Sequence, residues 1–193
     1  MKVCLRRIEG IWEEGWVLDK HTANSTYIGD NAYGHPQFDT VRTEVGEATF
    51  LLKYRSRWDQ VNPLAQAIAD NICRRLPNLG FIVPMPASRA RTKQPVTEVA
   101  NALGQIIGIP VFENILVRIP ASVSIKDLSS KDEKIAALAG QLILNDDITN
   151  QGKWNVLVVD DLFDSGASME AACRVLRTYP KVASVYVAAL TWK

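Results

Sequence analysis

The stretch VLVVDDLFDSGASMEAACRVL, residues 156–176, decides the fold of this chain. Its first part, Val156 to Val159, is a continuous apolar run, which is typical of a strand buried on both faces of a parallel sheet. Two adjacent carboxylates, Asp160 and Asp161, end the run, and a short loop of small residues then leads into an amphipathic helix. Parallel sheets bind ligands at the carboxyl ends of their strands, so this turn is the first candidate for a functional site.

The turn carries groups suited to a phosphorylated sugar. Ionised carboxylates such as Asp160 and Asp161 accept hydrogen bonds well from the two neighbouring hydroxyls of a ribose. The loop after them can direct successive backbone N–H groups at one phosphate, assisted by the positive end of the helix. Its glycine permits close approach of a ligand, and its serine hydroxyls add donors. The loop consists of Asp164, Ser165, Gly166, Ala167 and Ser168.

This order of residues resembles the phosphoribosyl pyrophosphate (PRPP) motif of type I phosphoribosyltransferases over all 13 positions from Val156 to Ser168. The resemblance implies that Asp160 and Asp161 hold the ribose hydroxyls of PRPP and that residues 164–168 wrap its 5-phosphate. The alternatives are a generic strand–turn–helix and the acidic pair of a receiver domain. A receiver would also need a downstream phosphoacceptor pattern, which this C-terminus lacks.

Asp164 distinguishes subfamilies of that group. Many members carry Thr or Ala at this loop position, whereas the 6-oxopurine phosphoribosyltransferases carry Asp. The resemblance to them implies that Asp164 is a catalytic base, which takes a proton from a nucleophilic nitrogen as the glycosidic bond forms. The alternative is an Asp that caps the loop by accepting hydrogen bonds from nearby N–H groups.

A second stretch, IVPMPASRARTKQPVTEVANAL from Ile82 to Leu103, joins a proline-rich strand end to a basic run and a helix. It resembles the competence-protein ComF group and related amidophosphoribosyltransferase-like proteins, in which the loop after this strand binds pyrophosphate. Cations suit that leaving group because its negative charge grows as the bond breaks. A solvated basic surface is the alternative. The candidates for this end of PRPP are Ala87, Ser88, Arg89 and Arg91, with Lys93 as a further cation.

The polar segment from Arg118 to Lys134 separates two apolar stretches and predicts a long mobile loop with a short helix towards its end. By the resemblance, residues 121–140 correspond to the loop that closes over the site. Three lysines would then be available to touch pyrophosphate, namely Lys126, Lys131 and Lys134.

The beginning of the chain departs from the ComF pattern. LLKYRSRWD, from Leu51 to Asp59, resembles the Leu-Lys-Tyr stretch before the first helix of ComF-like chains, so the resemblance covers about residues 51–190. Residues 1–50 hold only Cys4, unlike the zinc-binding amino terminus of that group, and this counts against a role in DNA uptake. We expect strands and loops there, forming a hood of residues 1–50 beside a phosphoribosyltransferase core of residues 51–193.

Two histidines in the first segment, His21 and His35, lie near Asp30 and Asp39. A metal site can be imagined from these four residues. No HxH or HExxH spacing supports ligation, so they are interpreted as polar loop residues.

The rest of the chain alternates between patterns of strands and helices. This alternation predicts an α/β fold of the type I phosphoribosyltransferase class, with a central, mostly parallel sheet of about five strands flanked by helices and a small N-terminal hood. Strands are expected at residues 15–19, 81–85, 109–112, 142–144, 154–159 and 182–190, and helices at 61–76, 95–107 and 167–178.

Composition limits the possible partners. The 193 residues fit one domain, and 22 basic against 21 acidic side chains leave a net charge of +1, which does not favour nucleic acid or membrane binding. Cys4, Cys73 and Cys173 have no CxxC spacing and are interpreted as reduced structural thiols. With no signal-peptide core and no apolar run near the roughly 20 residues that span a bilayer, a cytoplasmic protein is expected.

The predicted function is transfer of ribose 5-phosphate from PRPP to a nitrogen of a small-molecule acceptor, with release of pyrophosphate. Mg²⁺ is the expected cofactor, which would reach Asp160 and Asp161 indirectly through PRPP. The alternatives are a non-catalytic PRPP- or nucleotide-binding regulator and a ComF-like partner in DNA processing. A homodimer is the family expectation. The acceptor itself has no motif in this sequence.

Overall fold

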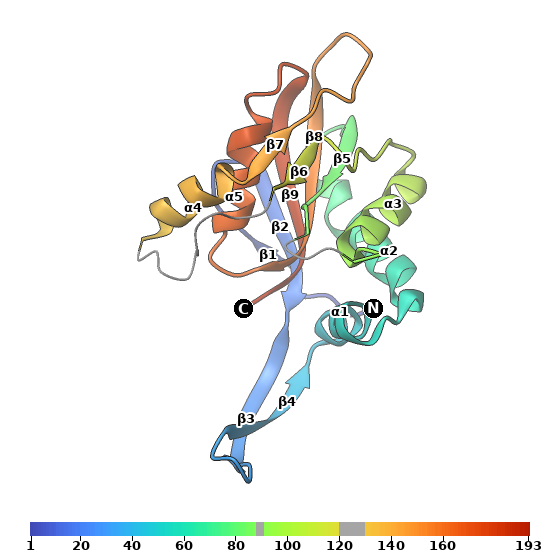
Figure 1. The fold of residues 1–193 in the computed structure, drawn as a ribbon. Coiled ribbons are helices and arrows are strands. Elements are labelled where there is room, and N and C mark those ends of the chain that lie inside the picture. Colours follow the sequence, from blue (N-terminus) through green and yellow to red (C-terminus); the bar gives the residue numbers. More distant parts are fainter. Residues whose placement is uncertain (88–90, 120–129) are drawn as a thin grey trace.

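A five-stranded sheet forms the centre of the molecule (Figure 1). The computed structural model describes residues 1–87, 91–119 and 130–193. Three of the four strand pairings in the sheet are parallel, and only the pairing of β1 with β2 is antiparallel. In spatial order the strands are β1 (Arg6–Arg7), β2 (Glu14–Lys20), β9 (Val182–Trp192), β8 (Trp154–Phe163) and β5 (Phe81–Pro84).

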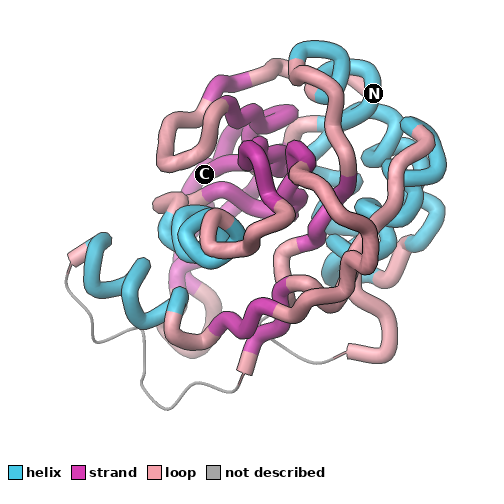
Figure 2. Tube along the Cα trace, turned by 90° about the horizontal axis from the view of Figure 1, so that it is seen from above, coloured by secondary structure: helices cyan, strands magenta, loops and turns pink. Residues whose placement is uncertain are grey.

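Both faces of the sheet are covered, as the views in Figures 1 and 2 show. One apolar cluster joins the sheet to α1 (Glu44–Arg55), α2 (Val61–Asn71) and α3 (Pro95–Ile107). The other cluster joins it to α4 (Lys131–Ala139), α5 (Ala167–Leu176) and a small sheet of β6 (Leu116–Arg118) and β7 (Leu142–Leu144). Short 3₁₀ turns at Trp58–Gln60 and Cys73–Arg75 flank α2.

Strand β8 is apolar throughout its first half because each face of it meets a different cluster. Val156 and Val158 belong to the cluster around α5, whereas Leu157 and Val159 belong to the cluster around α1 to α3. All four side chains are fully buried. Successive side chains of a strand point to opposite faces, so the same alternation governs the acidic residues that follow.

A long hairpin leaves the sheet at the end of β2. It consists of β3 (Thr22–Asp30) and β4 (Pro36–Arg42), and in Figure 1 it projects away from the sheet and its covering helices. Its turn is closed by Asn31, whose side-chain oxygen accepts hydrogen bonds from the amides of Tyr33 and His35. Among the described residues, no helix is long and apolar enough to cross a membrane.

Helix α1 begins where the hairpin returns to the body. Thr43 is its N-cap and accepts a hydrogen bond from the amide of Gly46 at 2.9 Å. Gly46 packs directly against the backbone carbonyl of His21, at the point where β2 passes into β3, and a Cβ at Gly46 would clash with that carbonyl. The first turn of α1 therefore needs a glycine to reach the sheet.

The predicted α/β class, a mostly parallel sheet of five strands flanked by helices, is confirmed. The helix expected at residues 95–107 and the strand at 142–144 have the predicted bounds. The strand expected at 109–112 is wrong, because only an isolated bridge between Val111 and Ile82 forms there. The strand expected at 154–159 continues to Phe163.

The expectation that the first segment contains only strands and loops is also wrong, because α1 begins at Glu44. Within the same segment, β2 is a full strand of the central sheet and the hairpin is not. The boundary between a hood of residues 1–50 and a core of residues 51–193 stays a prediction.

We expect Gly46→Ala to lower the free energy of unfolding by about 2 kcal/mol, because the added methyl forces α1 away from the carbonyl of His21. Urea titration followed by circular dichroism measures the change. Gly140→Ala is the matched control, since its φ of −65° is helical and the nearest atoms lie 3.6 Å from the added Cβ. A Gly46→Ala protein as stable as the control would contradict this packing.

Candidate functional site

A pocket of about 540 Å³ opens at the carboxyl ends of β5 and β8. The end of β8 and the loop after it contribute Asp160, Asp161, Leu162, Asp164 and Ser168. The segment after β5 contributes Met85, Pro86, Ala87, Arg91 and the start of α3, while α1 contributes Lys53 and Tyr54, and β6 contributes Arg118. The predicted ribose-binding acids, part of the predicted phosphate loop and part of the predicted pyrophosphate segment thus border one pocket.

Cations lie on both sides of the sheet beside the two adjacent acids. Asp161 points to the side of the sheet that carries α1, and its Oδ2 lies 2.6 Å from Nζ of Lys53. Both side chains are largely shielded from water, with 15% and 29% of their surface exposed. Asp160 interacts electrostatically with Arg118 of β6, which packs on the other side of the sheet. Strand alternation therefore directs the neighbouring carboxylates to opposite faces, while the charge of Lys53 acts on both of them and that of Arg118 acts on Asp160.

Asp160 is the strongly perturbed acid of the pair. Burial, and then the adjacent charge of Asp161, raise the pKa of Asp160 to about 7, against the opposing influence of Lys53 and Arg118. The amide of Asp161 also donates a 2.8 Å hydrogen bond to Oδ1 of Asp160. At neutral pH this carboxyl group exchanges its proton readily, so it can respond to the charge and hydrogen bonds of a ligand.

Arg118 brings unused hydrogen-bonding capacity to the pocket. Its Nε is buried and has no hydrogen-bond partner within the described residues. Burial lowers the pKa of Arg118, and the charge of Asp160 opposes that shift. A planar guanidinium group with an unsatisfied donor beside an open pocket is suited to the oxygens of an anion such as a phosphate.

The loop after β8 enters α5 through a glycine with a positive φ. Gly166, with φ of 79°, is the N-cap of α5, and the ring of Phe163 lies 3.0 Å from where its Cβ would be. No side chain of the N-cap satisfies the first turn of α5, and the amide of Ala167 makes only a long contact, 3.4 Å, with Oγ of Ser165. The exposed Asp164 stands at the entrance to this loop.

The predicted pyrophosphate segment is described in part. Ala87 and Arg91 line the pocket, and Nη1 of Arg91 donates a 2.9 Å hydrogen bond to the carbonyl of Lys53, which ties this segment to α1. Ser88 and Arg89 lie outside the described residues. Lys93 does not line the pocket, because it pairs with Glu98 and lies over the ring of Trp58.

The predicted closing loop, residues 121–140, lies outside the part of the chain that the structure describes over residues 121–129, and Lys126 falls there. Lys131 and Lys134 belong to α4, whose N-terminus is fixed by a capping box between Ser130 and Glu133. Lys134 is not among the residues that line the pocket.

His21 is linked to the acidic pair through one hydroxyl. Thr191 donates to the carbonyl of Asp161 at 2.9 Å, and its Oγ1 lies 3.3 Å from Nδ1 of His21. Burial, followed by the charges of Arg42 and Lys53, lowers the pKa of His21. Over residues 1–87, 91–119 and 130–193, no group of three or more His, Cys, Asp or Glu side chains could hold a metal ion.

Lys53 and Arg118 are the site residues that sequence reasoning missed. In the sequence, Lys53 belongs to the Leu-Lys-Tyr stretch and Arg118 is the first residue of the polar segment. Neither position alone indicates a functional site. The signals were present for both: α1 has a Thr N-cap and acidic residues in its first turn, and Arg118 lies between Val117 and Ile119. These signals predict a helix and a strand. They do not predict that the side chains of Lys53 and Arg118 lie close to the acidic pair.

Comparison with known proteins supports the resemblance. The chain is similar to the competence protein ComFC of Bacillus subtilis (strain 168), with 25% identity over 140 residues, 72% of this chain and 56% of that protein. The chain therefore spans little more than half the length of this relative. The resemblance to the ComF group that the sequence motifs indicated is confirmed by the match. No protein-family model matches the chain.

Solved structures with a similar fold include two phosphoribosyltransferases. Adenine phosphoribosyltransferase from Thermoanaerobacter pseudethanolicus is 15% identical, with 88% of this chain and 95% of that chain covered and a TM-score of 0.45. A hypoxanthine phosphoribosyltransferase from Staphylococcus aureus is 12% identical, with 70% and 65% covered and a TM-score of 0.44. Similarity at this level assigns no activity to the chain.

The raised pKa of Asp160 predicts a pH-dependent stability. An Asp carboxyl in the unfolded chain has a pKa of about 3.9, so between about pH 4 and pH 7 the folded protein binds more protons than the unfolded one. The free energy of unfolding should therefore fall as the pH rises through this window, and Asp160→Asn should remove much of the fall. Urea titrations at several pH values measure it.

Asp164→Asn is the control for that experiment, since this exposed carboxylate belongs to the same pocket. It should keep the pH dependence of the parent protein. Equal slopes for the parent and Asp160→Asn would refute the assignment of the buried proton to Asp160.

Proposed function

We propose that the chain binds PRPP in this pocket and transfers its ribose 5-phosphate to a nitrogen nucleophile, with release of pyrophosphate. The observation that carries the proposal is the meeting of Asp160 and Asp161 with the N-terminal loop of α5 at the edge of one pocket. Two neighbouring carboxylates suit the two hydroxyls of a ribose, and a helix N-terminus close to these carboxylates suits the phosphate of the same sugar. One continuous strand, loop and helix supplies both.

In this proposal the two acids hold the ribose 2- and 3-hydroxyls, and the loop 164–168 holds the 5-phosphate. Lys53 orients Asp161 and balances its charge through the 2.6 Å ion pair. Arg118 and Arg91 line the same pocket and stabilise the growing negative charge of the pyrophosphate as it leaves. Ala87, Ser88 and Arg89 complete the predicted pyrophosphate segment.

The transfer breaks the bond between C1 of the ribose and the pyrophosphate oxygen and forms a bond from C1 to the acceptor nitrogen. The nitrogen loses one proton, and Asp164 at the pocket entrance is the proposed base that takes it. Developing positive charge at the ribose ring is offset by the carboxylates beside it. The acceptor is a small nitrogenous molecule, a base or an amine.

Mg²⁺ is the proposed cofactor. Carboxylate oxygens such as those of Asp160 and Asp161 suit this ion, which prefers oxygen ligands and keeps several waters. Since the described residues offer no group of three protein ligands, the pyrophosphate of the substrate would supply most of its coordination. When bound, the ion supplies charge neutralisation for the leaving group.

A non-catalytic role as a PRPP-sensing regulator is the second candidate, and it is favoured by the similarity to a protein named for competence rather than for an enzymatic activity. Both candidates require PRPP binding, so turnover separates them. Pyrophosphate should accumulate with PRPP, Mg²⁺ and a panel of bases and amines if the protein is an enzyme. A partner in DNA processing would instead bind single strands with an affinity that falls steeply with salt.

Titration calorimetry with PRPP and Mg²⁺ tests the shared step. The double variant Asp160→Asn/Asp161→Asn should bind PRPP roughly 100-fold more weakly, since two charge-assisted hydrogen bonds of about 1.5 kcal/mol each are weakened. Omission of Mg²⁺ should also weaken binding by the parent. Undiminished affinity in the double variant would overturn the site assignment.

Lys53→Met should weaken PRPP binding about tenfold, because it removes a positive charge from the pocket and leaves Asp161 without its partner. Lys53→Arg should restore part of the loss. Lys93→Met is the control for loss of one positive charge: this lysine also forms an ion pair, with Glu98, but it is more exposed than Lys53 and does not line the pocket. Equal effects of Lys53→Met and Lys93→Met would show that only the total charge matters.

A further inference from the structure

One wall of the pocket is apolar and carries an accessible aromatic ring. It lies on the face of the sheet that α1 and α3 cover, which is also the face to which Asp161 points. Tyr54 of α1, with Pro95 and Val96 of α3, lines the pocket on this side. Pro95 is buried, whereas 58% of the surface of Tyr54 is exposed. Among the described residues that line the pocket, Tyr54 is the only aromatic one, so it is the group on which a flat ligand can stack.

The ring of Tyr54 is supported by a second ring of the same helix. Phe50 lies four positions earlier on α1, and the two ring centroids are 5.4 Å apart with an angle of 39° between the ring planes. The guanidinium carbon of Arg42 lies 3.8 Å from the centre of the Phe50 ring. A ring that its neighbours already hold loses little conformational freedom when a ligand packs on it. The support from Phe50 therefore favours stacking of a ligand on Tyr54.

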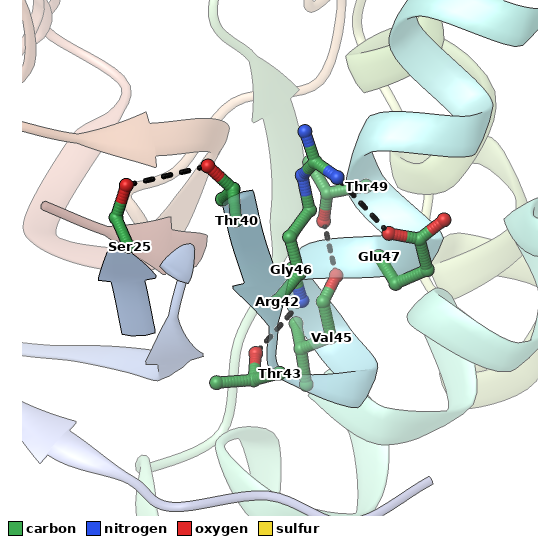
Figure 3. A network of polar contacts seen from close by, with 8 residues as sticks. All are labelled: Ser25, Thr40, Arg42, Thr43, Val45, Gly46, Glu47 and Thr49. Atoms are coloured by element: carbon green, nitrogen blue, oxygen red, sulfur yellow. Dashed lines mark hydrogen bonds and ion pairs between the residues drawn. The ribbon is translucent and has the colours of Figure 1, made fainter. Parts of the chain in front are cut away.

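The start of α1 is anchored, as Figure 3 shows. Thr43 accepts a 2.9 Å hydrogen bond from the amide of Gly46. Arg42, just before the helix, pairs with Glu47 at 3.4 Å. Tyr54 belongs to the last turn of the same helix, which is 12 residues long. Because the hydrogen-bonded turns of a helix have a fixed geometry, the anchored start determines where the ring of Tyr54 lies at the pocket.

Lys53 lies between this ring and the acid pair. Its Nζ is 2.6 Å from Oδ2 of Asp161 and 5.9 Å from the centre of the Tyr54 ring. In the proposed function, Asp160 and Asp161 hold the ribose 2- and 3-hydroxyls, and the reacting carbon C1 is bonded directly to C2. An acceptor that attacks C1 must therefore lie close to the acids, and the ring of Tyr54 lines the pocket there.

The charges of the pocket separate two classes of acceptor. Lys53, Arg91 and Arg118 all line it, and the carboxylate of Asp161 is already paired with Lys53. An aliphatic amine, with a pKa of about 10.4 like that of lysine, is a cation at neutral pH and is not nucleophilic until it loses a proton. The three cations of the pocket oppose the binding of such a group. A neutral heterocycle avoids both costs, and its flat face can pack on Tyr54.

The N-terminal segment does not supply this wall. Residues 1–50 all belong to the described part of the chain, and none of them lines the pocket. The hairpin of β3 and β4 projects away from the sheet and its covering helices (Figure 1). Selection of an acceptor in this pocket therefore depends on α1 and the start of α3 rather than on the predicted hood.

We propose that Tyr54 is the specificity-determining residue for the acceptor, and that its ring stacks on a neutral, planar nitrogen heterocycle. The inference rests on the proposed transfer function and narrows its acceptor from any base or amine to a heterocyclic base. A ring nitrogen forms the bond to C1 as the bond from C1 to the pyrophosphate oxygen breaks, and the proton of this nitrogen goes to Asp164. Stacking on an aromatic side chain tolerates different ring systems, so more than one flat base should react.

Pyrophosphate release in the presence of PRPP and Mg²⁺ tests this choice of acceptor. The panel contains adenine, hypoxanthine and uracil as heterocycles and ammonium and ethanolamine as amines, and only heterocycles should release pyrophosphate. Tyr54→Ala should raise KM for a reacting base roughly tenfold, as expected for loss of one stacking contact, while the dissociation constant of PRPP measured by calorimetry stays unchanged. Tyr54→Phe should restore KM because it keeps the flat ring, whereas Tyr54→Leu should not.

Tyr33→Ala is the control, because this tyrosine is 86% exposed in the turn of the hairpin and does not line the pocket. It should leave KM and PRPP binding unchanged. A protein that fails to bind PRPP would overturn the proposed function and this inference together. If PRPP binds, release of pyrophosphate with an amine and with no heterocycle would overturn this inference alone, and release with no member of the panel would overturn both in favour of the regulator. A Tyr54→Ala protein with the KM of the parent would also overturn the assignment of Tyr54.

Discussion

The site depends on one electrostatic constraint: two adjacent carboxylates at the end of a buried strand must be balanced from opposite faces of the sheet. Asp161 meets this constraint through a 2.6 Å ion pair with Lys53 of α1, and Asp160 through the charges of Lys53 and, more weakly, Arg118 on β6. Without cations on both faces, the strand would have to bury one or two uncompensated charges. The balance is incomplete for Asp160, whose pKa is raised to about 7. The helices and the small sheet are therefore part of the site as well as the covering of the core.

Because of this constraint, the position at which α1 begins matters for the site. Lys53 lies in the last turn of α1, so its position follows from where the helix begins. The start is fixed by the Thr43 cap and by the contact of Gly46 with the carbonyl of His21. The same junction anchors the hairpin, since Thr43 also binds the carbonyl of Lys20. One small cluster of contacts thus fixes both the direction of the hairpin, which points outwards, and the position of Lys53, which points towards the pocket.

The sequence was sufficient where the chemistry is local. The strand, acid pair, loop and helix of residues 156–176 follow from an apolar run, a glycine and a helical period, and the structure contains them in that order. The pairing of Asp161 with Lys53 was not predictable, because it depends on how α1 packs across the sheet from β8. The strand expected at 109–112 failed because this segment pairs with the edge strand β5 only around Ile82, whose backbone bonds to Pro110 and Phe112, and the pairing does not continue. The local sequence pattern thus predicted the strand, the loop and the helix with their acidic residues. Tertiary packing determined which cations lie beside those residues.

The distribution of charge is consistent with the proposal that a nearly neutral chain binds a polyanion. The net charge is only +1, so long-range attraction contributes little, and binding of a phosphorylated ligand must rely on donors close to it. Charges of opposite sign line different parts of the pocket. The acids lie at the end of β8, whereas the donors Arg91 and Arg118 come from the segments beside it. A ligand with a neutral sugar at one end and phosphates at the other fits this gradient better than a uniformly charged strand of nucleic acid would. The local arrangement of charge, rather than its total, therefore favours a small phosphorylated sugar as the ligand.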